Sequence, residues 1–136
     1  MGNRFRFYVL PFAVIFLIFC TAFPAVAATS TIVVSATCDP RGMIPEGSPF
    51  WGHVGFVLEQ LVENTPYTPN YSFKTRVGGG DSPAFGEAYC RPFCSPDSCQ
   101  ACLRQLSSGI WRICNSALGA RVEYPECWMH YECYSF

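Results

Sequence analysis

The stretch CRPFCSPDSCQACL, residues 90–103, decides how the chain is interpreted, because it holds four cysteines and a Cys99-x-x-Cys102 pair. Such a cluster is typical of three chemistries: a zinc site, a redox-active pair or part of a disulfide framework. The compartment of the protein separates these alternatives, since disulfides form in oxidising surroundings and are rare in the cytosol. The N-terminal residues therefore have to be considered first.

The first residues have the layout of a secretory signal peptide. Arg4 and Arg6 precede an apolar run over residues 8–23, and Ala25-Val26-Ala27 supplies small residues for cleavage. A transmembrane anchor is the alternative, because the apolar run is long. However, Pro11 and Pro24 interrupt the run and no basic stop-transfer segment follows.

We therefore expect residues 1–27 to be a cleaved signal peptide and residues 28–136 to form one domain. This domain is expected to be secreted to the extracellular space without a membrane anchor. Acidic side chains outnumber basic ones in it and no basic cluster is present, which argues against a nucleic-acid partner. We expect a monomer.

An oxidising compartment favours disulfides for the cysteine cluster. Only His53 and His130 are available as imidazole ligands, and neither has ligand spacing from the cluster, so the alternative is a zinc site of four thiolates. A thioredoxin-like role for Cys99 and Cys102 would need an alternating βαβ pattern, which is absent. The cluster is thus expected to be structural, and no metal or other cofactor is predicted.

Local patterns predict an α+β fold. Ser48-Pro49 and Ser95-Pro96 each combine a capping hydroxyl with a proline at the first helical position. Apolar residues at helical spacing follow both, and alternating or β-branched segments indicate strands. We expect helices at 49–63 and 96–113 and strands at 31–35, 71–77, 84–90, 120–124 and 128–134. The fold class is then an antiparallel sheet of four or five strands with two helices packed on it, stapled by disulfides.

Nothing in the chain indicates catalysis. No serine–histidine–acid arrangement is evident, and a reactive cysteine would have to lie outside the disulfide framework. Glu123 and Glu126 are conceivable as a glycosidase pair, but the turn-prone Tyr124-Pro125 between them makes their proximity incidental. His53 and His130 are interpreted as surface or packing residues. Gly78-Gly79-Gly80 is interpreted as a turn, because no phosphate-loop lysine and serine follow it. The protein is expected not to be an enzyme.

Several segments together resemble a known family. These are EGSPFWGHVGFVLEQLVENT, NYSFKT, AFGEAYC, SCQACL, ICNSALGARVEYPEC and YECYSF. In this order, and with the spacing Cys90-x8-Cys99-x2-Cys102, they resemble the ginkgobilobin-type, stress-antifungal domain of secreted plant cysteine-rich proteins and receptor kinases. The resemblance covers residues 35–136 and is nearest to the single-domain antifungal seed lectins of the family.

The resemblance implies a disulfide pairing that spacing alone does not determine. The implied bridges are Cys38–Cys114, Cys90–Cys99 and Cys102–Cys127. Cys94 and Cys133 have no counterpart in this six-cysteine pattern. A fourth bridge between them is expected, and a disulfide-linked dimer or two free thiols are the alternatives.

The resemblance also implies mannose binding by Asp39, Arg121 and Glu132. Glutamate accepts hydrogen bonds from sugar hydroxyls and arginine donates several in a fixed fork. Asp39 departs from the family pattern, which has asparagine there, because an ionised Asp only accepts. Asp39 is expected either to pair with Arg121, occupying a donor that the sugar needs, or to accept from a sugar hydroxyl itself.

Two functions follow from this comparison. The first is a secreted plant defence lectin that binds mannose-containing glycans of the fungal cell wall and inhibits fungal growth. The second is a non-catalytic secreted interaction or signalling module of the same fold without sugar binding, in which Arg121 and Glu132 are only a cross-strand surface pair. Asn70-Tyr71-Ser72 is in addition an N-glycosylation sequon, consistent with secretion.

Overall fold

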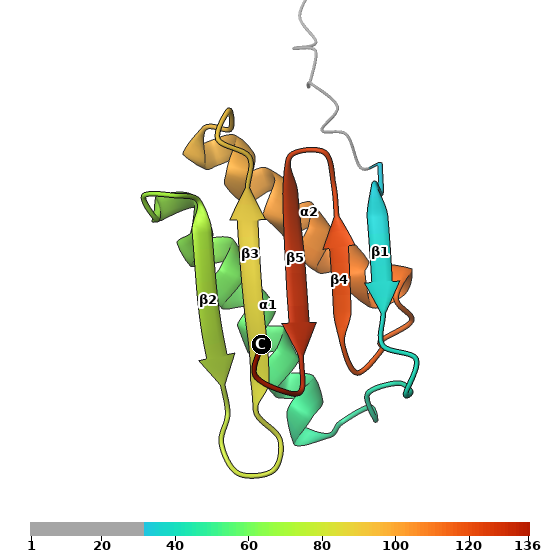
Figure 1. Cartoon of the computed structure of the whole chain (residues 1–136). Helices are drawn as coiled ribbons and strands as arrows, with labels where there is room; N and C mark the ends of the chain where they lie inside the picture. The colour runs from blue at the N-terminus through green and yellow to red at the C-terminus, as the bar shows by residue number, and fades with distance from the viewer. Residues whose placement is uncertain (1–31) are drawn as a thin grey trace, which may run out of the picture.

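The computed structural model describes residues 32–136, so the expected signal peptide lies outside the described residues. Five antiparallel strands form one sheet in the order β1-β4-β5-β3-β2, and Figure 1 shows β1 and β2 at its two edges. The elements are β1 (Ser35–Cys38), α1 (Pro49–Asn64), a short 3-10 helix η1 (Thr65–Tyr67), β2 (Ser72–Val77), β3 (Ala84–Cys90), α2 (Pro96–Ile113), β4 (Ala120–Glu123) and β5 (Cys127–Glu132).

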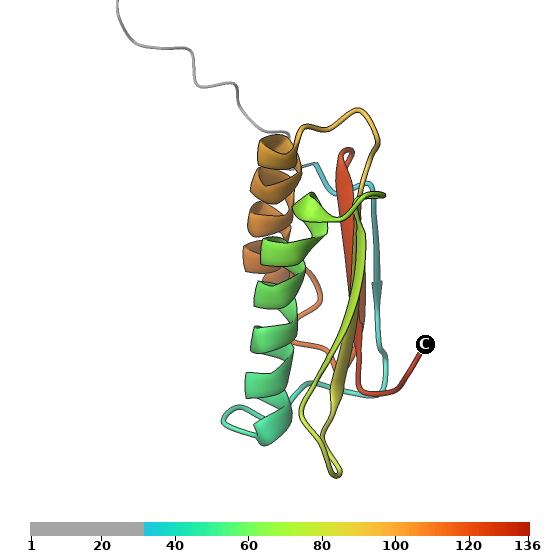
Figure 2. The same cartoon turned by 90° about the vertical axis from the view of Figure 1, so that its left-hand side faces the viewer.

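Both helices pack on the same face of the sheet, and the other face carries no helix (Figure 2). The predicted α+β class with two helices on an antiparallel sheet is therefore confirmed. Side chains alternate along a strand, so every second residue of each strand faces the helices. The remaining residues face the side of the sheet without helices, called the open face below. In β5, Cys127, Met129 and Tyr131 are buried on the helix side.

The helix starts form as the sequence indicates. The Ser48 hydroxyl accepts a hydrogen bond from the Trp51 N–H at 3.3 Å, and Pro49 takes the first helical position of α1. The Ser95 hydroxyl accepts from the Ser98 N–H at 3.1 Å, and the Ser98 hydroxyl caps the Ser95 N–H in return. These caps satisfy backbone donors that a helix cannot satisfy itself.

Close packing of α1 on the sheet depends on a glycine in β3. A Cβ atom at Gly86 would lie 2.2 Å from Cγ1 of Val57 and 3.1 Å from Cδ1 of Leu61. Only the absence of a side chain at this position lets the buried face of α1 lie directly on the strand.

The first strand is not where its β-branched residues predict it. The expected strand at 31–35 overlaps β1 only at Ser35, because β4 offers partners from Glu123, opposite Ser35, to Ala120, opposite Cys38. Ile32, Val33 and Val34 precede this ladder and are exposed. Pairing therefore overrides the β propensity of the residues.

Three disulfides link the sheet to α2 or its C-terminal end: Cys38–Cys114, Cys90–Cys99 and Cys102–Cys127. They are the pairs that the family resemblance implies. Cys90 and Cys127 are opposite each other in the β3–β5 ladder, so two of the bridges join neighbouring strands to successive turns of α2.

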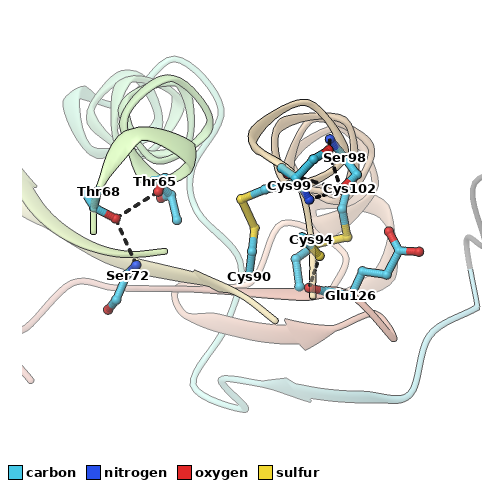
Figure 3. The surroundings of a disulfide bond; sticks show 11 residues. Thr65, Thr68, Ser72, Cys90, Cys94, Ser98, Cys99, Cys102 and Glu126 are labelled. Atoms are coloured by element: carbon cyan, nitrogen blue, oxygen red, sulfur yellow. Dashed lines mark hydrogen bonds between the residues drawn. A yellow bond between two sulfur atoms is a disulfide. The ribbon is translucent and has the colours of Figure 1, made fainter. Parts of the chain in front are cut away.

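The expected fourth bridge is wrong, because Cys94 and Cys133 are both free thiols. Cys94 follows the end of β3 at Cys90, and its thiol lies 3.7 Å from the Glu126 carbonyl oxygen (Figure 3). Cys133 follows Glu132, which pairs with Phe85 at the other end of β3. The two thiols are thus separated by roughly 17 Å of strand, whereas a disulfide needs Cα atoms within about 7 Å.

Removing the Cys38–Cys114 bridge should lower the free energy of unfolding by about 4 kcal/mol, because it closes the longest loop. We expect a Cys38→Ser/Cys114→Ala variant to lose hydrogen-exchange protection in β1 while β3 and β5 stay protected. Denaturant unfolding and exchange measured by NMR check this, with Cys133→Ser as a control that keeps all three bridges. Full protection of β1 in the double variant would contradict the prediction.

The two free thiols should differ in reactivity. Burial raises the pKa of the Cys94 thiol, whereas Cys133 is only half-buried. Since the thiolate is the reactive form, we expect iodoacetamide to alkylate Cys133 first in the native protein and Cys94 only on unfolding. Mass spectrometry of peptides after timed labelling measures both rates. Simultaneous labelling, or no labelling of either cysteine after denaturation, would show that the assignment is wrong.

Candidate functional site

A hollow of about 650 Å³ lies on the open face of the sheet, at the edge formed by β1, β4 and β5. The register places Thr37 of β1 opposite Arg121 of β4, and Arg121 opposite His130 of β5. Glu132 lies two residues after His130 and therefore on the same face. The lining residues are Thr37, Cys38, Asp39, Pro40, Arg41, Arg121, His130, Glu132 and Tyr134.

The three predicted sugar-binding residues, Asp39, Arg121 and Glu132, all line this one hollow. They come from three segments that are distant in the sequence. Asp39 directly follows β1, and its backbone N–H donates to the Gly119 carbonyl at 2.8 Å, just before β4. This bond continues the β1–β4 pairing by one residue and sets the position of Asp39 beside the sheet.

Glu132 is a buried charged residue of the site, with 9% of its surface exposed. Its Oε1 lies 3.1 Å from Nε2 of His130. A carboxylate only accepts, so the His130 Nε2–H donates this bond. The other oxygen, Oε2, is buried and has no hydrogen-bond partner within residues 32–136. A buried carboxylate oxygen without a donor is costly, so Oε2 is a candidate acceptor for a water or a ligand.

The carboxylate of Glu132 occupies the space over Gly119. A Cβ atom built on Gly119 would lie 1.9 Å from Oε2 and 2.4 Å from Cδ of Glu132. The glycine thus makes room for the carboxylate, and the position of this acceptor depends on a residue that has no functional group of its own.

Asp39 pairs with Arg41 and not with Arg121. Oδ1 of Asp39 accepts from the Arg41 backbone N–H at 2.8 Å and from Arg41 Nε at 3.0 Å, and Oδ2 accepts from Arg41 Nη2 as well. These hydrogen bonds hold the pKa of Asp39 below its usual value and raise that of Arg41. The expected alternative in which Asp39 occupies the Arg121 donor is therefore wrong.

Arg121 has no carboxylate within 4.0 Å among the described residues. Its guanidinium lies over the Trp128 ring, 4.0 Å from the centroid, in a cation–π contact. The interpretation of Arg121 and Glu132 as a surface ion pair is thus not supported. A cation–π contact uses the face of the guanidinium and pairs none of its N–H groups with a carboxylate. The Arg121 N–H groups therefore remain available as donors for a ligand.

The other candidate residues lie elsewhere or are otherwise engaged. Nδ1 of His53 lies 2.7 Å from the Ser82 carbonyl oxygen, which is a packing role. Glu123 forms an ion pair with Arg91. Asn70 is exposed in the turn before β2, at the sheet edge opposite β1, and its glycosylation stays a prediction.

The tryptophans divide between the two faces of the sheet. Trp51 and Trp111 stack at 4.8 Å between centroids, and Trp111 packs against Tyr131 on the helix side. Trp128 lies on the open face beside Tyr89 and under Arg121. Within the described part of the chain, no helix is long and apolar enough to cross a membrane, and no cluster of three metal-ligating side chains occurs.

Two lining residues beside Asp39 and Glu132 were not predicted from the sequence. Arg41 binds Asp39, and its guanidinium carbon lies 5.6 Å from the Tyr134 ring centroid. The Glu132 carboxylate raises the pKa of Tyr134, so the phenol lies within its electrostatic reach. The one available signal was the spacing Asp39-Pro40-Arg41, since an Asp side chain commonly bonds backbone two residues on.

The sequence was compared with protein families and with individual proteins, and it is similar to antifungal proteins of plants. The sequence model of the salt stress response/antifungal family matches residues 37–134. An antifungal ginkbilobin-like protein of Picea abies is 41% identical over 80% of this chain and 100% of its own length. Antifungal protein ginkbilobin-2 of Ginkgo biloba is also 41% identical, over 80% of this chain and 81% of its own.

Solved structures show the same fold. The tandem DUF26 ectodomain of the cysteine-rich receptor-like protein PDLP8 from Arabidopsis thaliana superposes with a TM-score of 0.70 at 25% identity. The superposition covers 79% of this chain and 51% of that chain. The chain therefore spans about half the length of that tandem ectodomain.

Replacing Gly119 by Ala should displace the Glu132 carboxylate and leave the fold intact, because the clashing atoms are the end of a flexible side chain. We expect the His130–Glu132 hydrogen bond to break, with a free energy of unfolding within about 1 kcal/mol of the wild type. Imidazole ¹⁵N shifts of His130 and thermal unfolding measure the two effects. Gly79→Ala is the control, since a Cβ there meets nothing within 4 Å. Unchanged His130 shifts in Gly119→Ala would contradict this geometry.

Proposed function

The chain belongs to the salt stress response/antifungal family, and on that premise we propose that it is a secreted plant defence lectin. It binds mannose-containing glycans of the fungal cell wall in the hollow between Asp39, Arg121 and Glu132, and in doing so inhibits fungal growth. Support for the antifungal part comes from relatives about 40% identical that are named antifungal proteins.

The observation that carries the sugar-binding part is the buried Oε2 of Glu132, which lacks a donor within the described residues. A hexose offers neighbouring hydroxyl groups that each donate and accept. One hydroxyl can donate to the Glu132 carboxylate while another accepts from the Arg121 guanidinium, which has no protein carboxylate as partner in the described residues.

The charges of the hollow favour a neutral ligand. Asp39 pairs with Arg41, and Arg121 and Glu132 add one formal charge of each sign to the lining, so the four charges sum to zero. An anionic or cationic ligand would add a net charge to a site whose own charges already balance. Mannose is neutral and interacts only through hydroxyl and apolar C–H groups, and a hollow of this openness is expected to give modest affinity.

The second candidate function is a non-catalytic interaction or signalling module without sugar binding. One observation favours it: Arg41 engages both oxygens of Asp39, which leaves that side chain 8% exposed. If sugar binding needs a direct contact to residue 39, this pairing prevents it. The same titration separates the two functions.

We expect mannose, titrated into the oxidised domain of residues 28–136, to give saturable amide shifts in ¹⁵N NMR spectra around Asp39, Arg121 and Glu132. Glu132→Gln should weaken binding about tenfold or more, because a charged acceptor is replaced by a neutral amide of the same shape. Glu59→Gln on the exposed side of α1 is the matched control. Fungal growth inhibition by the wild type and Glu132→Gln should follow the same order.

An Asp39→Asn variant completes this experiment. Binding only in Asp39→Asn would show that the aspartate disables an otherwise intact site. No shifts in either protein would contradict mannose binding and favour the interaction module.

A further inference from the structure

The structure contains a second basic residue at the hollow whose position suits direct contact with a sugar. We propose that Arg41 is a ligand-binding residue and that Asp39 acts as the group that positions it. This inference rests on the proposed function only in taking a sugar as the ligand of the hollow.

Accessibility separates the two members of the pair. The side chain of Asp39 is 8% exposed, whereas that of Arg41 is 56% exposed. The oxygens of Asp39 accept four hydrogen bonds from Arg41: one from the backbone N–H, two from Nε and one from Nη2. A ligand that enters the hollow therefore meets the guanidinium before it meets the carboxylate.

The guanidinium is also held in place before a ligand arrives. Nε and Nη2 bind Asp39, Nη2 lies 3.5 Å from Sγ of Cys133, and the Tyr134 ring lies 5.6 Å from the guanidinium carbon. Nη1 has no hydrogen-bond partner among residues 32–136, so its two N–H groups are free to donate. A donor group fixed in advance loses little entropy on binding, which favours affinity.

Arg41, Tyr134 and Glu132 all line the hollow, and the Arg41 guanidinium carbon lies 5.6 Å from the Tyr134 ring centroid. The Glu132 carboxylate raises the pKa of the Tyr134 phenol. Arg41 and Arg121 thus both supply donors to a hollow in which Glu132 is an acceptor. This arrangement suits a neutral sugar ring, whose hydroxyls both donate and accept.

The pair also explains how an aspartate can stand at a position where the sugar needs a donor. Asp39 itself can only accept. The carboxylate positions a guanidinium, and the guanidinium donates. Asp39 and Arg41 together provide the donor that Asp39 alone lacks.

A double-mutant cycle on Asp39 and Arg41 tests this role. If Arg41 donates to the sugar, Arg41→Gln should weaken mannose binding about tenfold or more in the wild type and also in an Asp39→Asn background. If Arg41 only neutralises Asp39, its loss should have no effect once residue 39 is Asn. Arg41→Lys, which keeps the charge but not the fork, should restore binding only in part. Arg76→Gln, an exposed arginine on β2 of the same face, is the control.

A direct readout accompanies the affinities. The Arg41 Nε–H and Nη–H resonances in ¹⁵N spectra should shift on addition of sugar, which a remote structural role would not cause. All variants are checked for the wild-type fold by their amide spectra. Mannose, glucose, galactose and N-acetylglucosamine are tested in parallel.

The outcomes separate this inference from the proposed function. Mannose binding that is unchanged in Arg41→Gln, or restored in the double variant, overturns the role of Arg41 and leaves the lectin function intact. Binding of another sugar that depends on Arg41 supports the role of Arg41 and rejects mannose. If none of the four sugars causes NMR shifts, both the role of Arg41 and the proposed sugar binding are overturned.

Discussion

The disulfide between Cys38 and Cys114 is the constraint on which the candidate site depends. All four residues of β1 are exposed, so the strand contributes no buried side chain to the core. Its attachment consists of backbone pairing with β4 and of this one covalent link to the end of α2. Asp39 and Arg41 follow Cys38 immediately. One side of the hollow is formed by β1 and the residues after it, and β1 has no core contacts. The position of this side therefore depends on the Cys38–Cys114 bridge.

Side chains alternate along each strand, so the two faces of the sheet have different roles. In β5, the neighbouring residues Tyr131 and Glu132 illustrate the division. The Tyr131 hydroxyl donates to the Ala117 carbonyl at 2.7 Å inside the core, and burial raises its pKa well above the usual value. Glu132 points the other way, to the open face, where one carboxylate oxygen lacks a partner in the described structure. Stability is concentrated on the helix side and polar chemistry on the other.

Much of the fold could be predicted from the sequence because its signals are local. Ser48-Pro49 and Ser95-Pro96 mark both helix starts, and α1 and α2 begin at those prolines. β1 could not be placed, because its pairing with β4 outweighs the β-branched residues before it. The fourth bridge failed for a related reason: an even number of cysteines says nothing about the length of strand between Cys94 and Cys133. Asp39, Arg121 and Glu132 line one hollow, but the reason for grouping them came from the family resemblance. Arg41 was missed because an exposed arginine in a loop has no periodicity.

The helix-free face has a consequence for how such domains diversify. Arg41, Arg121 and Glu132 lie away from the core, so their replacement removes few apolar contacts and little of the free energy of folding. Selection can then alter ligand preference by point substitution without first acquiring compensating stability, a condition that favours evolvability. Gly119 is the exception, because its missing side chain is a steric requirement of Glu132. Lineages that retain the glutamate should tolerate nothing larger at 119, whereas lineages that have lost it are released from that restriction.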